Sequence, residues 1–214
     1  MKLQLVSPKN PMNKRALDLL REVLSRTKSK PAPENVSTDV AKIEARIKDI
    51  ETHEGKFGAP FDDISFHGMD LSKLNLSAYR LHGTNLSNAD FRNAFLVGVT
   101  LDYVDCCFTD FTGADLRGAD IRKAFPLNSI YVGTDLRIPP SSIKLYTDSY
   151  IFAVHTFLIN CAFLHTKITP EQKELFIRVT SGVLPPRFFN QARFQVVPWT
   201  NEDQKVVDSA RFLI

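Results

Sequence analysis

An apolar side chain recurs at every fifth position of this chain from Phe61 to Leu136, and the phase of the repeat never slips. A period of five fits neither an α-helix nor a flat strand, so the chain must turn a corner once in each repeat. Four corners make a square coil of about twenty residues, with the recurring side chains at its centre. These central positions are Phe61, Phe66, Leu71, Leu76, Leu81, Leu86, Phe91, Leu96, Leu101, Cys106, Phe111, Leu116, Ile121, Pro126, Tyr131 and Leu136.

Two neighbouring positions of the repeat are restricted as well. The residue two before each central position is often small, as at Ala89 and Ala114, and the residue one before is often Asp or Asn. The motifs 114–118 (Ala-Asp-Leu-Arg-Gly) and 119–123 (Ala-Asp-Ile-Arg-Lys) resemble the pentapeptide-repeat family. The resemblance covers residues 59–138 and implies a mainly β fold, a right-handed quadrilateral β-helix of about four coils with α-helical additions.

The first coil departs from this pattern. Ile64, Met69 and Leu74 are bulky where the family prefers small residues, and so is Tyr79 at the start of the second coil. We therefore expect the first coil to be wider or distorted. An open coil end exposes unpaired strand edges and apolar core, so it needs a cap. Sequence adjacency assigns that cap to a helix in the segment 37–58.

The chain divides into four segments: an amphipathic N-terminal helix with a linker, a capping helix, the β-helix, and an α-rich C-terminal region that packs on the β-helix or extends it. The first helix is expected from Asn13 to Thr27, because its leucines recur mostly at helical spacing. Pro139 and Pro140 end the repeat, since proline cannot donate a hydrogen bond to a β-ladder. The segments, in order, are 1–36, 37–58, 59–138 and 139–214.

The C-terminal region carries no five-residue period. Residues 147–164 are apolar enough for a buried helix, although this stretch is too short and too interrupted to span a bilayer. A second helix is expected after the cap residue Thr169, with proline at its first position, and it closes at Gly182. A short strand at 194–197 and a final helix at 202–212 complete the chain.

The net charge of +3 is mild and argues against both a strongly basic nucleic-acid binder and an acidic mimic of nucleic acid. The basic stretch from Arg21 to Lys30 could touch an anionic membrane, but a solvated helix packed on its neighbour explains it better. Three cysteines, two of them adjacent, are too few for a disulfide framework and fit a reducing compartment. The N-terminus lacks the apolar core of a signal peptide. We expect a soluble, cytoplasmic protein; the alternative is secretion into a host cell without a conventional signal peptide.

Little in the sequence could carry catalysis. It lacks a phosphate-binding loop, a dinucleotide fingerprint, and the His-Glu-x-x-His and Cys-x-x-Cys motifs. Cys161 and His165 lie four residues apart on the expected helix, a spacing that could hold a metal or pair a nucleophile with a base, but no further ligand joins them. His67 and His82 fall on different sides of the repeat. We therefore expect no enzyme activity, no cofactor, no metal site and no catalytic residue.

Residues one coil apart should stack on one face, so the outward positions can be compared as columns. One column contains Asp70, Asp90 and Asp110, which could imitate phosphates. The favoured interpretation is that each carboxylate binds the backbone of its own corner. Family members of the quinolone-resistance type imitate DNA, but they are more acidic and have about twice as many coils.

Apolar side chains also gather on the outside of the expected β-helix. Four of them lie on neighbouring coils of one side, and three lie nearby on other sides. A monomer seldom leaves so much apolar surface exposed. Either the apolar C-terminal helix folds back over it, which we favour, or it contacts a second copy of the chain or another protein. The candidate interaction surface consists of Cys107, Phe108, Phe125 and Leu127 on one side, with Phe95, Val97 and Tyr103 on others.

These observations predict a non-enzymatic scaffold for protein–protein interaction, with a partner that the sequence does not identify. A bacterial effector delivered into a host cell is the alternative from another class, and the N-terminal segment would then be a mobile signal. A DNA mimic, or an enzyme that uses the C-terminal region, fits the sequence less well.

Overall fold

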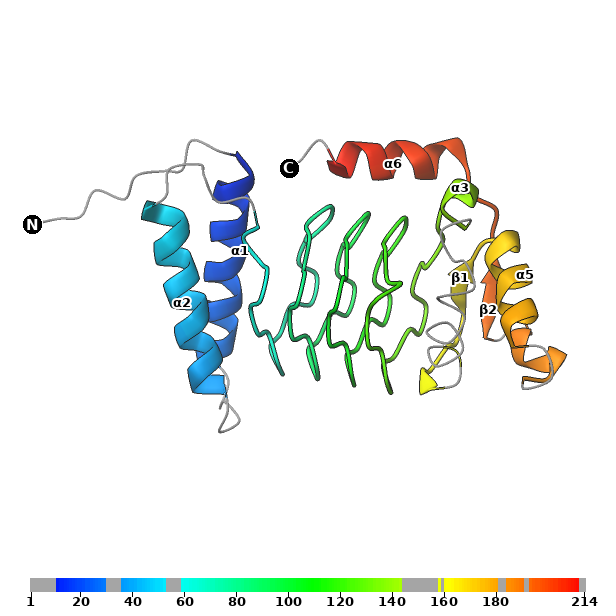
Figure 1. Ribbon diagram of the computed structural model, residues 1–214, viewed down its shortest axis with the longest axis horizontal. Helices are drawn as coiled ribbons and strands as arrows, with labels where there is room; N and C mark the ends of the chain where they lie inside the picture. The colour runs from blue at the N-terminus through cyan, green and yellow to red at the C-terminus, as the bar shows by residue number, and fades with distance from the viewer. Residues whose placement is uncertain are drawn as a thin grey trace, which may run out of the picture.

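The computed structural model describes residues 11–29, 36–52, 59–143, 158, 160–180, 184–190 and 193–211. Two helices stand at one end of a coiled body, and further helices with a two-stranded parallel sheet stand at the other end (Figure 1). None of the described helices is long and apolar enough to cross a membrane. In chain order the elements are α1 (Pro11–Lys28), α2 (Val36–Thr52), α3 (Pro140–Ile143), β1 (Thr166–Ile168), α5 (Pro170–Val179), the 3-10 helix η2 (Pro186–Phe189), β2 (Phe194–Val196) and α6 (Asn201–Arg211).

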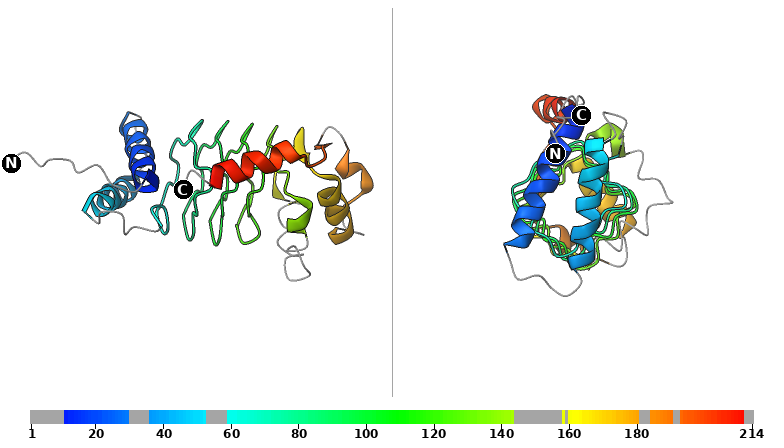
Figure 2. Two further views of the ribbon diagram at one scale, coloured as in Figure 1. Left: turned by 90° about the horizontal axis from the view of Figure 1, so that it is seen from above. Right: turned by 90° about the vertical axis from the view of Figure 1, so that its left-hand side faces the viewer.

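Residues 59–138 wind as a β-helix with twenty residues in each coil. Parallel bridges join residues twenty apart in consecutive coils, such as Asp70 with Asp90. The backbone turns at every fifth residue, and φ is positive at almost all of these corners from Asp63 to Gly133. Seen along the axis, the coils lie over one another (Figure 2). The coil length and the stacking predicted from the five-residue period are confirmed.

Each coil has four sides, and the sides of successive coils stack into four faces of the body. A corner of two residues separates each face from the next, and the first and third faces are opposite sides of the coil. We name the faces by the residues that bridge along them. These are Ser65, Asn85, Asp105 and Phe125 on the first face; Asp70, Asp90, Asp110 and Ile130 on the second; Asn75, Phe95, Asp115 and Asp135 on the third; and Arg80, Thr100 and Asp120 on the fourth.

The central side chains fill the interior of the coils, and all of them are buried except Ile121, which is half-buried. Along the second face the aromatic rings of Phe91, Phe111 and Tyr131 stack in register, with centroids 5.4 and 5.1 Å apart. Buried hydroxyl groups tie each coil to the one before it. Thr134 Oγ1, for example, donates to the Phe111 carbonyl oxygen at 2.6 Å. The interior is therefore held both by apolar burial and by satisfied polar groups.

Both N-terminal helices cover the first coil, so α1 shares the capping role that sequence adjacency assigned to residues 37–58. Leu17 and Leu20 of α1 and Ile43 of α2 are buried in the same core as the coils. The four bulky residues that depart from the repeat pattern are buried in this core as well. They are Ile64, Met69, Leu74 and Tyr79, and the Tyr79 hydroxyl donates to the Met12 carbonyl oxygen at 3.1 Å.

Arginine side chains of α1 donate the hydrogen bonds that a preceding coil would otherwise supply. In the second coil, the Arg92 and Phe95 carbonyl oxygens accept hydrogen bonds from backbone N–H groups of the first coil. The equivalent carbonyls of the first coil, those of Ser72 and Asn75, have no coil before them. They accept from Arg26 at 2.6 Å and from Arg15 at 2.9 Å instead. The open edge of the β-helix is thus satisfied by side chains of α1.

Residues 160–168 extend the β-helix beyond the predicted repeat. Ala162 bridges to Ile130 in the same parallel sense as the coils, although 32 residues separate this pair rather than twenty. The ring of Phe163 stacks on Tyr131 with centroids 5.6 Å apart, and the buried Thr166 hydroxyl donates to the Tyr131 carbonyl oxygen. Segments 161–165 and 166–170 therefore take the places of two further pentapeptides.

The buried helix predicted for residues 147–164 is wrong at its C-terminal end. Leu158 and Asn160 are helical, but Cys161 to Leu164 are not, and residues 147–157 and 159 lie outside the described residues. The physical reason is that the Phe163 side chain continues the aromatic stack, which requires ladder geometry rather than helix geometry. β1 then pairs in parallel with β2, whose Phe194 lies on Phe163 at 5.0 Å.

The other C-terminal elements agree with the sequence predictions. Thr169 caps α5 in a capping box with Gln172, and proline occupies the first helical position. The predicted closing residue, Gly182, lies outside the described residues. β2 and α6 fall within one residue of the predicted strand and final helix. α6 then runs back along the outside of the coils (Figure 1).

Candidate protein-interaction face

The helix α6 covers the corner between the third and fourth faces. Val207 and Ala210 of α6 are buried together with Val97 of the second coil. The corner is built from small residues, and a Cβ added to Gly118 would lie 2.8 Å from Val207 Cγ2. Val97, a member of the predicted interaction surface, is therefore covered by the chain itself. The covering element is α6 rather than the predicted helix 147–164.

A buried ion-pair cluster holds α6 in this place. Asp203 of α6 accepts hydrogen bonds from Arg117 at 2.9 Å and from Arg137 at 2.8 Å. Burial alone would raise the pKa of Asp203, but hydrogen bonds from Arg117 and Thr200 and the charge of Arg137 outweigh burial and hold it at about 2. The carboxylate therefore stays ionised and connects the last helix to two successive coils.

Five of the seven predicted surface residues meet on and beside the first face. Phe125 lies on this face in the fourth coil, and Tyr103 stands at the corner before it in the third coil. Phe108 and Leu127 stand at the corner after the face, with half-buried Cys107 beside them. The three aromatic side chains are 55–58% exposed and Leu127 is 41% exposed. We call Tyr103, Phe108, Phe125 and Leu127 the aromatic patch.

Phe95 does not belong to this patch. It is 50% exposed, but it lies on the third face, on the opposite side of the coil. Ile130, which is not one of the predicted surface residues, extends the patch onto the second face and is 36% exposed. The sequence indicates its exposure, because Ile130 is an apolar residue at the repeat position that most often carries Asp or Asn.

Charges of both signs border the aromatic patch. Lys123 Nζ stands 5.1 Å above the ring of Tyr103 and 3.9 Å from Asp102 Oδ1. Asp105, one coil before Phe125 on the first face, accepts a hydrogen bond from the Cys107 backbone N–H at 2.9 Å. Burial, and then Asp105, raise the pKa of the Cys107 thiol. The rim of the patch therefore offers a cation and carboxylates close to apolar surface.

The other half of the first face is polar. A hollow of about 600 Å³ lies there between α2 and the first two coils, and its lining includes Asp39, Ser65, His67 and Ser87. His67 Nδ1 lies 2.7 Å from Ser87 Oγ, but this hydroxyl donates to Asn85 Oδ1 at 2.6 Å. The serine proton is thus directed at the amide oxygen and not at the imidazole. Ser87 and His67 therefore do not form a nucleophile–base pair.

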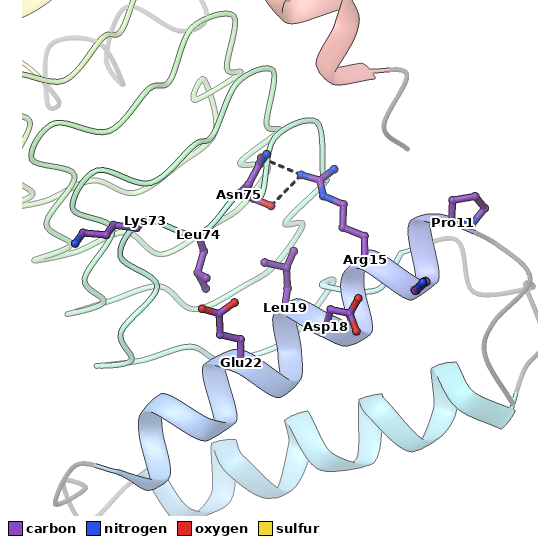
Figure 3. Close-up of a pocket in the computed structure, with 9 residues that line it drawn as sticks. Pro11, Arg15, Asp18, Leu19, Glu22, Lys73, Leu74 and Asn75 are labelled. Atoms are coloured by element: carbon purple, nitrogen blue, oxygen red, sulfur yellow. Dashed lines mark hydrogen bonds between the residues drawn. The ribbon is translucent and has the colours of Figure 1, made fainter. Parts of the chain in front are cut away.

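A second hollow of about 470 Å³ separates α1 from the first coil (Figure 3). The Arg15 guanidinium points across it to Asn75, and its Nη2 donates to both the backbone and the side-chain oxygen of Asn75 at 2.9 Å. Asp18 and Glu22 face the same space from α1. Since the Arg15 donors serve the cap, this hollow is a feature of the capping contact rather than an anion site.

The column of aspartates on the second face has a structural role. The column of Asp70, Asp90 and Asp110 is stacked, and each carboxylate accepts a hydrogen bond from the backbone N–H two residues later. The favoured interpretation as corner bonds is confirmed. Among the described residues, no group of three or more His, Cys, Asp and Glu side chains could hold a metal ion.

Cys161 and His165 do not lie on a helix, contrary to the prediction. Cys161 points inward, its Sγ donates to the Pro126 carbonyl oxygen at 2.7 Å, and burial raises its pKa to about 12. His165 stands at a corner with a positive φ of 53°. The two residues hold structural places in the extended ladder and make no reactive pair.

The repeat geometry agrees with the comparison to known families. A family model described as pentapeptide repeats matches residues 59–96 and 96–125, in eight copies. Residues 59–125 are therefore similar to the pentapeptide-repeat family. No curated protein matches the chain.

Several solved structures are similar to this chain. One is a pentapeptide-repeat protein of the Arabidopsis thaliana thylakoid lumen, with 27% identity over 40% of this chain and 63% of that one, and a TM-score of 0.29. Another is Rfr23 from the cyanobacterium Cyanothece 51142, with 29% identity over 32% of this chain and 51% of that one, and a TM-score of 0.18. QnrB1, a plasmid-mediated fluoroquinolone resistance protein, has 16% identity over 72% of this chain and 66% of that one, and a TM-score of 0.32. This chain thus spans less than two thirds of the length of the first two.

Proposed function

We propose that this protein is a non-enzymatic scaffold for protein–protein interaction and that it docks its partner on the aromatic patch. One observation carries the proposal: three aromatic side chains, each more than half exposed, gather around the third and fourth coils of one face. The apolar corner around Val97, by contrast, is covered by α6. Exposed and clustered aromatic side chains are typical of binding hot spots.

The chemistry of the patch favours a protein over a nucleic acid or a membrane. Leu127 and Ile130 add aliphatic surface to the aromatic rings. The nearby Lys123 lies beside Asp102 rather than in a cluster of positive charges. A phosphate backbone would require many more cations on this face. We further propose the right-handed quadrilateral form of the β-helix. We also propose a cytoplasmic location, which the three unpaired cysteines support.

The alternative function, a secreted effector with a mobile N-terminal signal, has less support. Arg15 and Arg26 of α1 bind carbonyls of the first coil, so this helix has a structural task in the cap. Limited proteolysis of the isolated protein distinguishes the two proposals. Resistance of α1 to cleavage favours the scaffold, and rapid cleavage throughout residues 11–28 favours the mobile signal.

The docking proposal is tested by proximity labelling in the native cell with three forms of the full chain. The double variant Phe108→Asp/Phe125→Asp places charges in the aromatic patch. Phe95→Asp places the same charge on an equally exposed aromatic position of the opposite face and is the matched control. We expect a set of neighbours shared by wild type and Phe95→Asp and lost from the double variant. The same neighbours around all three forms would overturn the proposal.

A further inference from the structure

We infer that the aromatic patch is occupied by a second copy of this chain, so that two molecules pack first face to first face about a two-fold axis. The inference rests on the proposed function, because it names the occupant of the same face. Closed two-fold dimers are the commonest symmetric assemblies, and they require a surface that is complementary to itself. Three features of the patch meet that requirement.

The first feature is the size of the patch. Tyr103, Phe108 and Phe125 are 55, 56 and 58% exposed, and Leu127 and Ile130 are 41 and 36% exposed. With about 150–250 Å² of surface for a whole aromatic side chain, these residues together offer on the order of 400–500 Å². Two copies would bury roughly 800–1,000 Å² of apolar surface before any polar rim is counted, close to the lower bound for a specific interface.

The second feature is self-complementarity. In the lattice of coils Asp105 and Phe125 are bridged neighbours at the middle of the first face. A two-fold axis that relates two facing copies must lie in the interface. If it passes between these two residues and runs along the sides of the coils, it exchanges the two coils and keeps each corner. It therefore places Phe108 against the partner's Leu127, an apolar contact. It also places Tyr103 against the partner's Lys123, a cation–π contact.

The third feature is that both ends of the stack are covered. The first coil lies beneath α1 and α2, and the last layer lies beneath α5 and η2, whose Phe176 and Phe189 pack against Phe194. Strand edges at the two ends are thus shielded from end-to-end addition of another copy. We therefore expect association through a lateral face, and among the described residues of the coils the aromatic patch is the apolar cluster that α6 leaves open.

The oligomeric state of the full chain in solution tests the inference. We expect sedimentation equilibrium to give a dimer for wild type and for Phe95→Asp, and a monomer for Phe108→Asp/Phe125→Asp. Phe108 has a positive φ of 59°, which Asp adopts more readily than Phe, so this substitution should not unfold the corner. Unchanged thermal melting by circular dichroism checks the fold of each variant.

A cysteine cross-link gives a second, independent measurement. Cys107 is half-buried at the edge of the patch, whereas Cys106 and Cys161 are buried. A bismaleimide should therefore join Cys107 to the partner's Cys107 in wild type and in Phe95→Asp. It should fail in the double variant and in Cys107→Ser.

Two results would overturn the dimer. One is a monomeric wild type at millimolar concentration, and the other is equal dissociation of Phe95→Asp and the double variant. A monomer that still has neighbours in the cell through the patch overturns the second copy as occupant and leaves the proposed function standing. A monomer whose neighbours are the same in all three forms overturns both.

Discussion

Arg137 donates two hydrogen bonds to Asp203, at 2.8 and 2.9 Å, across 66 residues of sequence. Arg117, one coil earlier, donates to the same carboxylate. Arg117 and Arg137 are in turn paired with Asp115 and Asp135, which lie two residues earlier on the third face. The last helix is therefore attached to the β-helix through corner arginines that the repeat had already fixed in place.

We predict that Asp203→Asn weakens the attachment of α6. The change keeps the shape of the side chain but leaves two partly buried guanidinium groups short of a carboxylate, which costs about 3 kcal/mol. Urea unfolding followed by circular dichroism measures the loss. Asp208→Asn, on the exposed side of the same helix, is the control and should change stability by less than about 0.5 kcal/mol. Equal effects of the two changes would contradict the cluster.

The contribution of Asp203 should also depend on pH in a defined direction. Its pKa is about 2 in the folded protein, because the arginine hydrogen bonds outweigh burial, and about 3.9 when unfolded. A carboxylate whose pKa is lower in the folded state stabilises the fold at pH values above its unfolded pKa. This stabilisation is lost as the pH falls through the folded pKa. The difference in unfolding free energy between wild type and Asp203→Asn should therefore be constant near neutral pH and shrink between about pH 4 and pH 2. A constant difference down to pH 2 would refute the assignment.

Two glycines provide a separate test of how closely α6 packs. Gly118 and Gly133 have nearly the same positive φ, 66° and 64°, so alanine at either position meets the same backbone penalty, about 1–2 kcal/mol. A Cβ at Gly118 would also lie 2.8 Å from Val207 Cγ2, while a Cβ at Gly133 meets no atom within 4 Å. Gly118→Ala should therefore destabilise more than Gly133→Ala and should speed amide hydrogen exchange in α6. Equal hydrogen exchange in the two variants would show that α6 does not touch this corner.

The body of the fold follows directly from the sequence because its repeat is strict. A five-residue phase held from Phe61 to Leu136 leaves one arrangement of inside and outside positions. Leu101, at the middle of this column, is 2% exposed, so Leu101→Lys should unfold the protein. Thr100→Lys, one residue earlier and facing outward on the fourth face, should leave the melting temperature within a few degrees. A folded Leu101→Lys variant would contradict the phase.

The candidate face was harder to predict, because its accessibility depends on distant elements. The sequence alone places Phe108 and Phe125 on one side, but it does not say which corner the last helix covers. The small residues Ala78, Gly98 and Gly118 in one corner column were the signal for α6. The acid that faces the corner arginines, Asp203, lies far along the chain and has no local pattern.

The extension of the β-helix escaped sequence analysis for a different reason. Two repeats are too few to establish a period, and the 32-residue spacing from Ile130 to Ala162 breaks the phase. Only two motifs of the extension keep the repeat pattern of a small residue followed two positions later by an apolar one. These are Cys161 with Phe163 and Thr166 with Ile168. Apolar character without a period was therefore interpreted as a helix.

The last prediction tests whether residues 161–164 have the geometry of a β-ladder or of a helix. Phe163 is 4% exposed and lies between Tyr131 and Phe194 in the aromatic stack, with centroids 5.6 and 5.0 Å away. Phe163→Ala should therefore cost about 3–5 kcal/mol in unfolding free energy, the usual range for a buried aromatic side chain. The adjacent Leu164 is 43% exposed at the corner, so Leu164→Ala should cost less than about 1 kcal/mol. If Leu164→Ala proved as damaging as Phe163→Ala, the alternation of inward and outward positions in this segment would be wrong. The aromatic stack would then end at Tyr131.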